Sequence, residues 1–252
     1  MNNGRLQFFA IIFFMLLLLI FAMPALAEPL PSIDLQVNPT DNPEEVVDSL
    51  KLLTLLTVLA MAPAILIMMT SFTRIVVVLS FVRNALATQQ TPPNQVLIGL
   101  ALFLTFFTMA PVYGEIKTEA IDPYLAGEIT QEAALSQAAI PLKDFMLKQT
   151  REKDLALFIK MSETERPDNK DNLPLHVLIP AFMISELKTA FQMGFLIYIP
   201  FLVIDMVVAS TLMSMGMFMV PPIIISLPFK ILLFVMTDGW FLVVKSLLES
   251  YR

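Results

Sequence analysis

The chain has 252 residues, of which 57% are hydrophobic and 15% are charged, and its mean hydropathy is +0.75. Soluble domains usually carry about 25% charged residues, so this composition favours a helical membrane protein. The formal net charge of −6 argues against a nucleic-acid partner, because nucleic acids select basic surfaces. The absence of cysteine excludes disulfide bridges and thiolate metal sites.

The first 27 residues predict a cleavable signal peptide. A long apolar run ends in Ala25-x-Ala27, the small-x-small pattern that signal peptidase recognises. We expect cleavage before Glu28; the alternative is an uncleaved anchor helix. Residues 28–49 contain six acids, four prolines and no Lys or Arg, which predicts a short, extended, acidic leader outside the cytoplasm.

A first helical hairpin is predicted over residues 50–112. Each end of this range is an apolar stretch. Both stretches are close to 20 residues long, about the length of a helix that crosses a bilayer. The loop predicted between them, 70–95, carries Arg74 and Arg83 and no acid. The positive-inside rule places this basic loop in the cytoplasm and therefore places the start of the mature chain outside.

The remainder predicts a polar segment followed by a second hairpin. Residues 113–178 are rich in acids, with apolar residues at helical spacing, which predicts a small helical extracytoplasmic segment. Residues 179–252 predict two further apolar helices, over 179–208 and 223–248, joined by a Met-rich loop at 213–219. The expected fold is an all-α membrane protein with about four long apolar helices arranged as two hairpins around the extracytoplasmic segment.

Five charged residues interrupt the second hairpin. A charge near the centre of a bilayer costs about 2.5–3.5 kcal/mol, so five are too many for two lipid-exposed helices. We expect them to pair within a helical bundle or between subunits. Alternatively, these charged residues lie near the membrane interface or extend their side chains towards it. This alternative explains Asp205 least well. The five residues are Glu186, Lys188, Asp205, Lys230 and Asp238.

Four methionines alternate near the middle of that hairpin. A regular helix would spread residues of this spacing around its circumference, whereas a looped or extended segment would aim them in one direction. Because methionine is flexible and apolar, the pattern favours a soft constriction or contact loop over simple filling of core gaps. The residues, with the aromatic residue among them, are Met213, Met215, Met217, Phe218 and Met219.

Motifs for catalysis are missing from the sequence. It contains no HExxH, no GxSxG and no Gly-rich phosphate loop, and its single histidine, His176, lies alone at an apolar boundary. We therefore expect neither an enzyme nor a bound cofactor or metal.

Three blocks of sequence resemble the FliP family, the flagellar biosynthetic membrane proteins of the type III export gate. The first begins Thr70-Ser-Phe-Thr-Arg74 and runs to residue 95, the second contains Glu186-Leu-Lys188 within 180–195, and the third covers 205–222. The resemblance extends over essentially the whole mature chain. It implies an export-gate subunit in the bacterial inner membrane, multi-pass, within the flagellar basal body.

Several further expectations follow from the resemblance alone. It implies several copies of the chain, expected as a pentamer, with FliQ-like and FliR-like membrane subunits and other export-apparatus proteins. Unfolded flagellar subunits would pass through the centre, and some apolar helices would pack against neighbouring subunits instead of lipid. The methionines at 213–219 would form a gasket that closes the pore, and Glu186, Lys188 and Asp205 would make intersubunit contacts.

Two alternatives to the flagellar gate stay open at this point. The corresponding subunit of a virulence type III secretion system shares the same blocks; the signal peptide and the sizeable segment after residue 112 favour the flagellar branch. An ion-coupled transporter would instead bind a cation or proton at Asp205 and Glu186, although the sequence shows no pair of halves with matching hydropathy.

Overall fold

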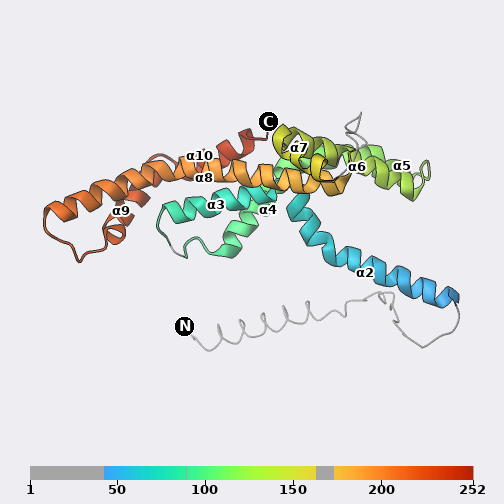
Figure 1. Cartoon of the computed structure of the whole chain (residues 1–252), viewed down its shortest axis with the longest axis horizontal. Helices are drawn as coiled ribbons and strands as arrows, with labels where there is room; N and C mark the ends of the chain where they lie inside the picture. Colours follow the sequence, from blue (N-terminus) through green and yellow to red (C-terminus); the bar gives the residue numbers. More distant parts are fainter. Residues whose placement is uncertain (1–42, 89, 163–172, 252) are drawn as a thin grey trace, which may run out of the picture. The chain divides into compact units, whose positions relative to one another are not determined.

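The computed structural model describes residues 43–88, 90–162 and 173–251, and every regular element in these ranges is a helix (Figure 1). The chain divides into two units, 1–56 and 57–252. In the first unit the described residues form the start of α2 (Pro43–Met69). The predicted signal peptide lies outside the described residues, and so do its cleavage residues Ala25, Ala27 and Glu28.

Helix α2 begins earlier than the sequence predicted. The expected extended leader ran to residue 49, but the helix starts at Pro43. Proline suits the first helical position because its fixed φ is already helical and its missing N–H needs no partner there. The prediction of an extended leader was therefore wrong for its last residues.

Two helical stretches in the second unit are long and apolar enough to cross a membrane. The first is α4 (Asn94–Ile116), which continues through a π-helical turn, η1 (Lys117–Ile121), into α5 (Asp122–Leu125). The second is α8 (Leu175–Ser214), which has 40 residues. A third span exists within the described ranges if a bent helix pair near the end of the chain counts as one.

That bent pair replaces a single helix predicted over 223–248. Helix α9 (Pro222–Met236) and helix α10 (Gly239–Glu249) meet at an angle of 63°. The residue at the bend, Asp238, has φ 51°, which is left-handed. An L-residue in that conformation cannot continue a right-handed helix, so the prediction of one unbroken helix was wrong.

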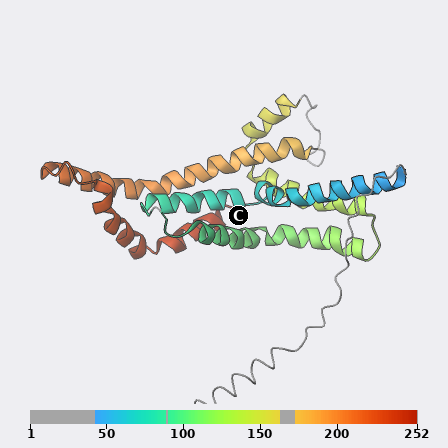
Figure 2. The same cartoon turned by 90° about the horizontal axis from the view of Figure 1, so that it is seen from below.

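The predicted loop at 70–95 contains a helix. Residues 72–85 form α3 (Phe72–Ala85), and Ile75, Val78, Leu79 and Val82 are fully buried along one face of it. This i, i+3, i+4, i+7 spacing is that of an amphipathic helix. Helix α3 packs along α8 and also contacts α4, as Figure 2 shows within the second unit. The loop prediction was wrong here because it gave weight to two arginines and missed the apolar stripe between them.

Two apolar clusters hold the second unit together. One gathers α3, the first half of α4, the middle of α8, and α9 with α10, and Val78, Ala101, Ala190 and Leu247 belong to it. The other gathers the end of α4, the start of α8, and α6 (Gln131–Gln149), and it includes Met146. A further short helix, α7 (Glu152–Met161), packs on α8. The described parts of 113–178 are thus mostly helical, with non-helical residues at 126–130 and 150–151. Their side of the membrane stays a prediction.

Candidate functional site

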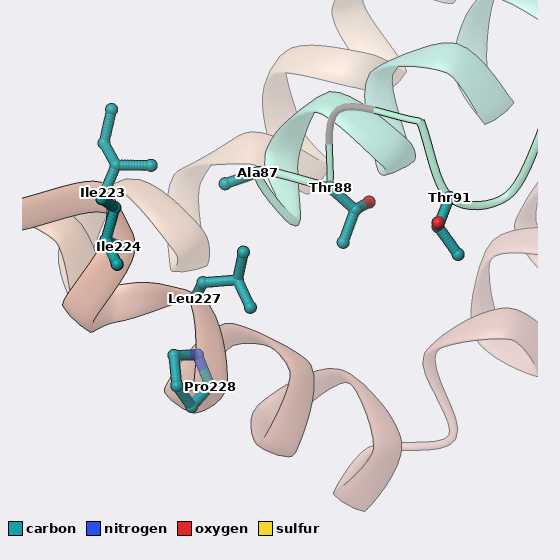
Figure 3. A pocket seen from close by; sticks show the side chains of 7 residues that line it. All are labelled: Ala87, Thr88, Thr91, Ile223, Ile224, Leu227 and Pro228. Atoms are coloured by element: carbon teal, nitrogen blue, oxygen red, sulfur yellow. The ribbon is translucent and has the colours of Figure 1, made fainter.

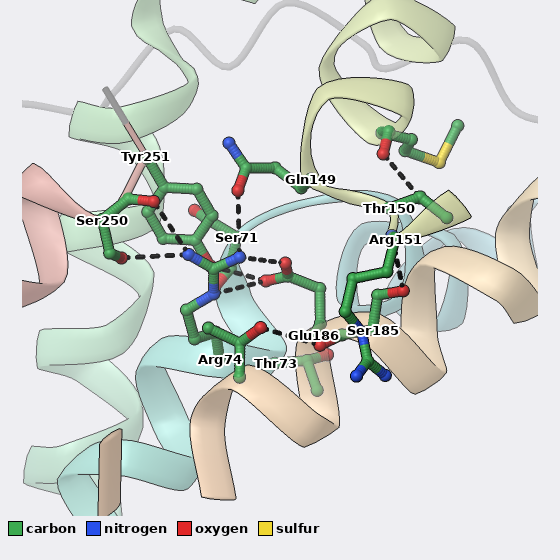
Figure 4. A network of polar contacts seen from close by, with 12 residues as sticks. Ser71, Thr73, Arg74, Gln149, Thr150, Arg151, Ser185, Glu186, Ser250 and Tyr251 are labelled. Carbon is green, nitrogen blue, oxygen red and sulfur yellow. Dashed lines mark hydrogen bonds and ion pairs between the residues drawn. The ribbon is translucent and has the colours of Figure 1, made fainter. Parts of the chain in front are cut away.

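A buried ion pair joins α3 to α8 (Figure 4). Arg74 is 1% exposed and Glu186 is 0% exposed. Arg74 Nε donates to Glu186 Oε2 at 3.0 Å, and Arg74 Nη2 forms an ion pair with Glu186 Oε1. This bidentate geometry is the strong form of an arginine–carboxylate contact. It places two charges, both singled out in the sequence, against each other inside a single chain.

The remaining donors of Arg74 reach two other segments. Nη1 donates to the carbonyl and to the hydroxyl oxygen of Ser250, both at 3.0 Å, and Nη2 also donates to Gln149 Oε1 at 3.0 Å. An arginine side chain has five N–H donors, and all five are used here. The Tyr251 hydroxyl donates to Glu186 Oε2 at 2.7 Å, so the carboxylate is also well satisfied. Such a saturated network offsets the high cost of burying the two charges.

A second polar cluster lies beside the first, between α7 and α8. The Ser185 hydroxyl donates to Asp154 Oδ2 at 2.7 Å and accepts from the Arg151 backbone N–H at 3.1 Å. Arg151 and Asp154 also form an ion pair at 2.5 Å. Burial raises the pKa of Asp154, but the Ser185 hydrogen bond and the Arg151 charge outweigh it and hold that pKa below its ordinary value. Lys188, exposed on α8, lies near this cluster.

A third cluster joins α8 to α9. Lys230 is 1% exposed, and its Nζ contacts Asp205 Oδ2 at 2.5 Å. The Ser226 hydroxyl donates to the other oxygen, Oδ1, at 2.5 Å. Both oxygens of Asp205 are therefore occupied by groups of the same chain, and the lysine is neutralised where it is buried. Asp238, in contrast, is exposed at the bend between α9 and α10.

The two arginines expected in a basic loop have different surroundings. Arg74 lies in the core of the second unit, as described above. Arg83, half-buried in the last turn of α3, donates to Asn94 Oδ1 at 2.5 Å and so ties the end of α3 to the start of α4. Their role in setting the orientation across a membrane stays a prediction.

The methionine run follows a helix end that glycine makes possible. The Gly216 N–H donates to the Met213 carbonyl at 3.0 Å, and the Met217 N–H donates to the Leu212 carbonyl at 3.0 Å. These two bonds, with Gly216 at φ 75°, are those of a Schellman motif. The helix thus includes Met213, the loop begins at Met215, and the predicted loop boundary of 213 was two residues early.

The side chains of the methionine run are open to the surroundings of the single chain. Met213, Met215 and Met217 are exposed, and Phe218 and Met219 are 79% and 97% exposed. Because the run passes from a helix into a tight turn, it is not one extended strand with all methionines on one side. The loop is therefore apolar and exposed in the single chain.

A pocket of about 440 Å³ lies between the loop after α3 and the first turns of α9 (Figure 3). Thr88 and Thr91 contribute its hydroxyls, and Ile223, Leu227 and Pro228 contribute apolar surface. None of the lining residues titrates near neutral pH. The pocket therefore offers no group for acid–base chemistry, and no group of His, Asp or Glu side chains in the described ranges could hold a metal.

Sequence reasoning missed the partners that complete these clusters. Gln149, Ser226, Ser250 and Tyr251 are ordinary polar residues in the sequence, and no motif distinguishes them. The helical spacing from Asp205 gave no hint of Ser226 either, since the two lie on different helices. One signal was present: an apolar helix that carries Glu186 requires a buried cation, and Arg74 directly precedes an apolar run, residues 75–79.

Comparison with known proteins gives a consistent result. The model of the FliP family matches residues 55–247. The chain is 62% identical over 212 residues to the flagellar biosynthetic protein FliP of Bacillus subtilis (strain 168), a match that covers 84% of this chain and 96% of that protein.

Relatives from distant bacteria are similar over most of their length. The chain is 52% identical over 233 residues to the flagellar biosynthetic protein FliP of Pectobacterium carotovorum, covering 92% of this chain and 90% of the relative. It is 52% identical over 225 residues to the flagellar biosynthetic protein FliP of Aquifex aeolicus, covering 88% and 92% respectively.

Proposed function

Because the chain belongs to the FliP family, we propose that it is a structural subunit of the membrane gate that exports flagellar proteins. It acts as a membrane-associated component of the flagellar export apparatus, together with other subunits, and its role is structural. The identity of 62% to a flagellar relative favours the flagellar branch over virulence secretion. The observation that carries the proposal is the match across residues 55–247, which includes both ion pairs of α8 and the Met-rich loop.

The Met-rich loop supports a pore-closing role. We define the gasket loop as residues 213–219, whose Met213, Met215, Met217, Phe218 and Met219 side chains are exposed in the single chain. Several copies of such a loop around an axis would give a soft apolar ring. Flexible thioether side chains can pack against one another and yield to a passing chain. We propose that these five residues form the seal of the resting gate.

The exposed apolar surface of the helices supports assembly. Phe103, Phe106 and Phe107 on α4, and Phe195 and Leu196 on α8, are all more than half exposed. Only lipid or another subunit can cover so much apolar surface. We propose a closed ring of several copies, a pentamer, in contact with FliQ-like and FliR-like subunits and with membrane lipid.

The placement of the chain in the membrane is also a proposal. We propose delivery by a signal peptide at 1–27, four apolar segments in two hairpins, and an extracytoplasmic position for 113–178. The distribution of charge supports this arrangement: basic Arg83 precedes α4, whereas the segment after α4 is acidic. Multi-pass insertion in the inner membrane follows from the same reasoning.

The ion pairs weigh against an ion-coupled transporter. In that mechanism Asp205 and Glu186 would be open to a cation. In the structure Asp205 contacts Lys230, and Glu186 is held by Arg74 and Tyr251. A carboxylate that already neutralises a buried base gains little from a second cation. If the carboxylate were protonated instead, the buried base would be left without a counter-charge.

The gasket loop gives the direct test of the proposal. The four methionines are replaced together by alanine in the assembled complex, and ion leakage through the resting gate is measured in vesicles. We expect increased leakage, because each replacement removes most of an apolar side chain from the seal. Met161→Ala is the matched control, since Met161 is 73% exposed on α7, away from the loop. Leakage equal to that of the unchanged complex would contradict the gasket.

A native mass measurement tests assembly separately. The detergent-extracted complex is expected to contain several copies of this chain with smaller membrane subunits. A monomer without membrane partners would contradict a gate built by assembly, whatever the outcome of the leakage measurement.

A further inference from the structure

The two residues that follow α10, Ser250 and Tyr251, reach into the centre of the second unit. Ser250 accepts two hydrogen bonds from Arg74 Nη1, one at its carbonyl and one at its hydroxyl. The Tyr251 hydroxyl donates to Glu186 Oε2 at 2.7 Å and approaches the Ser71 carbonyl at 3.2 Å. A dipeptide thus contacts both partners of an ion pair that links two other helices (Figure 4).

The ring of Tyr251 adds contacts of a different kind. Its face lies 4.0 Å from Arg74 Cζ, a cation–π geometry. The ring also stacks on Phe145 of α6, with centroids 6.0 Å apart and planes inclined by 22°. Burial raises the pKa of Tyr251 well above its usual value, so the phenol keeps its proton and remains a donor. The side chain is therefore fixed by polar, cationic and aromatic neighbours from three helices.

Helix α10 depends on this anchor at its far end. At its start the chain bends by 63° at the exposed Asp238. Along its length, Val243 and Leu247 enter the apolar cluster, but neither fixes a direction as a hydrogen bond does. The exposed ion pair Lys245–Glu249 lies within α10 itself and ties it to nothing else. At the bend, Trp240 packs edge-on against Phe234 of α9. The polar bonds at 250–251 hold the other end of α10 in place.

We propose that Ser250 and Tyr251 form a clamp that positions α10 on the Arg74–Glu186 pair. The clamp acts on the ion pair as well, because it supplies three of the hydrogen bonds that the two buried charges require. In the sequence, α9 lies between the gasket loop and the clamp. It is attached to α8 by the contacts of Lys230 and Ser226 with Asp205. The bent pair α9–α10 is therefore fixed at both of its helices.

The consequence for the gate rests on the proposed function. If the gasket loop closes a pore, its position depends on α9, which begins at Pro222, three positions after the last residue of the loop. A loosened α10 would let α9 turn about its Asp205 contact and would misplace the loop. The clamp residues, far from the loop along the chain, would then affect how tightly the gate closes.

Hydrogen–deuterium exchange of the assembled complex tests the clamp itself. Tyr251→Phe keeps the ring, its stacking and its contact with Arg74, and removes only the hydroxyl. Because a hydrogen bond to a charged group is lost, we expect peptides covering 239–251 to exchange roughly tenfold faster. Ser250→Ala removes one acceptor and keeps the carbonyl, so we expect a smaller change in the same peptides. Tyr124→Phe is the control, since Tyr124 is exposed on α5.

The outcomes separate the clamp from the gate. Exchange in Tyr251→Phe equal to that of the unchanged complex would overturn the clamp, since a ring that only fills space is preserved in phenylalanine. Faster exchange throughout α4 and α8 would also overturn it, because the hydroxyl would then serve the whole fold. Faster exchange confined to 239–251 with increased ion leakage supports both steps. Local exchange without leakage supports the clamp and refutes its connection to the gasket.

Discussion

Replacing Glu186 by glutamine tests whether the Arg74–Glu186 pair is the central polar contact of the fold. The substitution keeps size and shape but removes the negative charge, so Arg74 stays buried without a counter-charge. Breaking a buried pair in this way costs about 3–5 kcal/mol. In the native protein, Arg74 and Tyr251 donate to the two carboxylate oxygens of Glu186. In the glutamine variant one of these oxygens becomes an NH₂ group, which is a donor and cannot accept their hydrogen bonds. A cost at the upper end of that range follows.

This cost is large against the total stability of a domain, which is about 5–15 kcal/mol. For chains of about 150–250 residues, 1 kcal/mol moves the unfolding midpoint by about 2–4 °C. A loss of about 3–5 kcal/mol therefore lowers the midpoint by roughly 6–20 °C. The measurement is thermal unfolding of the detergent-extracted complex, compared at one heating rate.

Glu249→Gln is the matched control, with the same chemical change at an exposed site. Glu249 and Lys245 are 59% and 54% exposed and 3.8 Å apart, and such pairs contribute about 1 kcal/mol or less. We expect a shift of no more than a few degrees. If Glu186→Gln shifts the midpoint no more than this control, the central role of the pair is refuted.

A charge exchange then decides whether the pair forms within one chain. Arg74→Glu and Glu186→Arg are combined in the same chain, or carried by two separate chains expressed together. An intrachain pair predicts partial recovery of the midpoint only when both changes are in one chain. Recovery in the mixture of singly changed chains would refute the intrachain geometry and favour an intersubunit pair.

Three further changes test other parts of the structure. Gly194→Ala places a Cβ 2.5 Å from the Phe81 ring, so we expect a loss of about 1–3 kcal/mol in unfolding free energy; Gly99→Ala, with open space around it, should cause no loss. Gly216→Ala keeps a left-handed φ that costs an L-residue about 1–2 kcal/mol, and we expect faster hydrogen exchange across 213–219. The pKa of Asp154 is lowered from its ordinary value of 3.8 in the folded protein. This shift stabilises the fold at pH values above 3.8, and the contribution is lost as the pH falls through the lower, folded-state pKa. Asp154→Asn should therefore unfold at a midpoint that depends less on pH between about 5 and 2.

The all-helical class and the apolar spans were readable from the sequence because both depend on local pattern. An apolar stretch the length of α4 or α8 has few alternatives to a buried or membrane-spanning helix. The charged residues in the last two apolar segments were recognised as needing partners for the same energetic reason. In two cases the structure supplies partners within the chain: Arg74 for Glu186, and Lys230 for Asp205.

The failures of prediction concern helix ends and residues distant in sequence. Helix α3 was missed because two arginines drew attention from the buried stripe at Ile75, Val78 and Val82. The break before α10 depends on the single left-handed residue Asp238, which sequence pattern does not distinguish from a helical aspartate. Tyr251 lies 65 positions from the carboxylate it contacts, and no local rule connects them.

The two charge clusters of α8 are spaced in a way that relieves much of the conflict between charge and lipid. Glu186 and Asp205 are 19 positions apart in an unbroken helix, which is about 28 Å at 1.5 Å per residue. The hydrocarbon core of a bilayer is about 30 Å thick. A bilayer centred between them would place each cluster near one edge, with Lys188 also close to an edge and the gasket loop beyond the Asp205 edge. The charges then need no place at the bilayer centre, and the parts of α8 that extend past each edge remain available to other subunits.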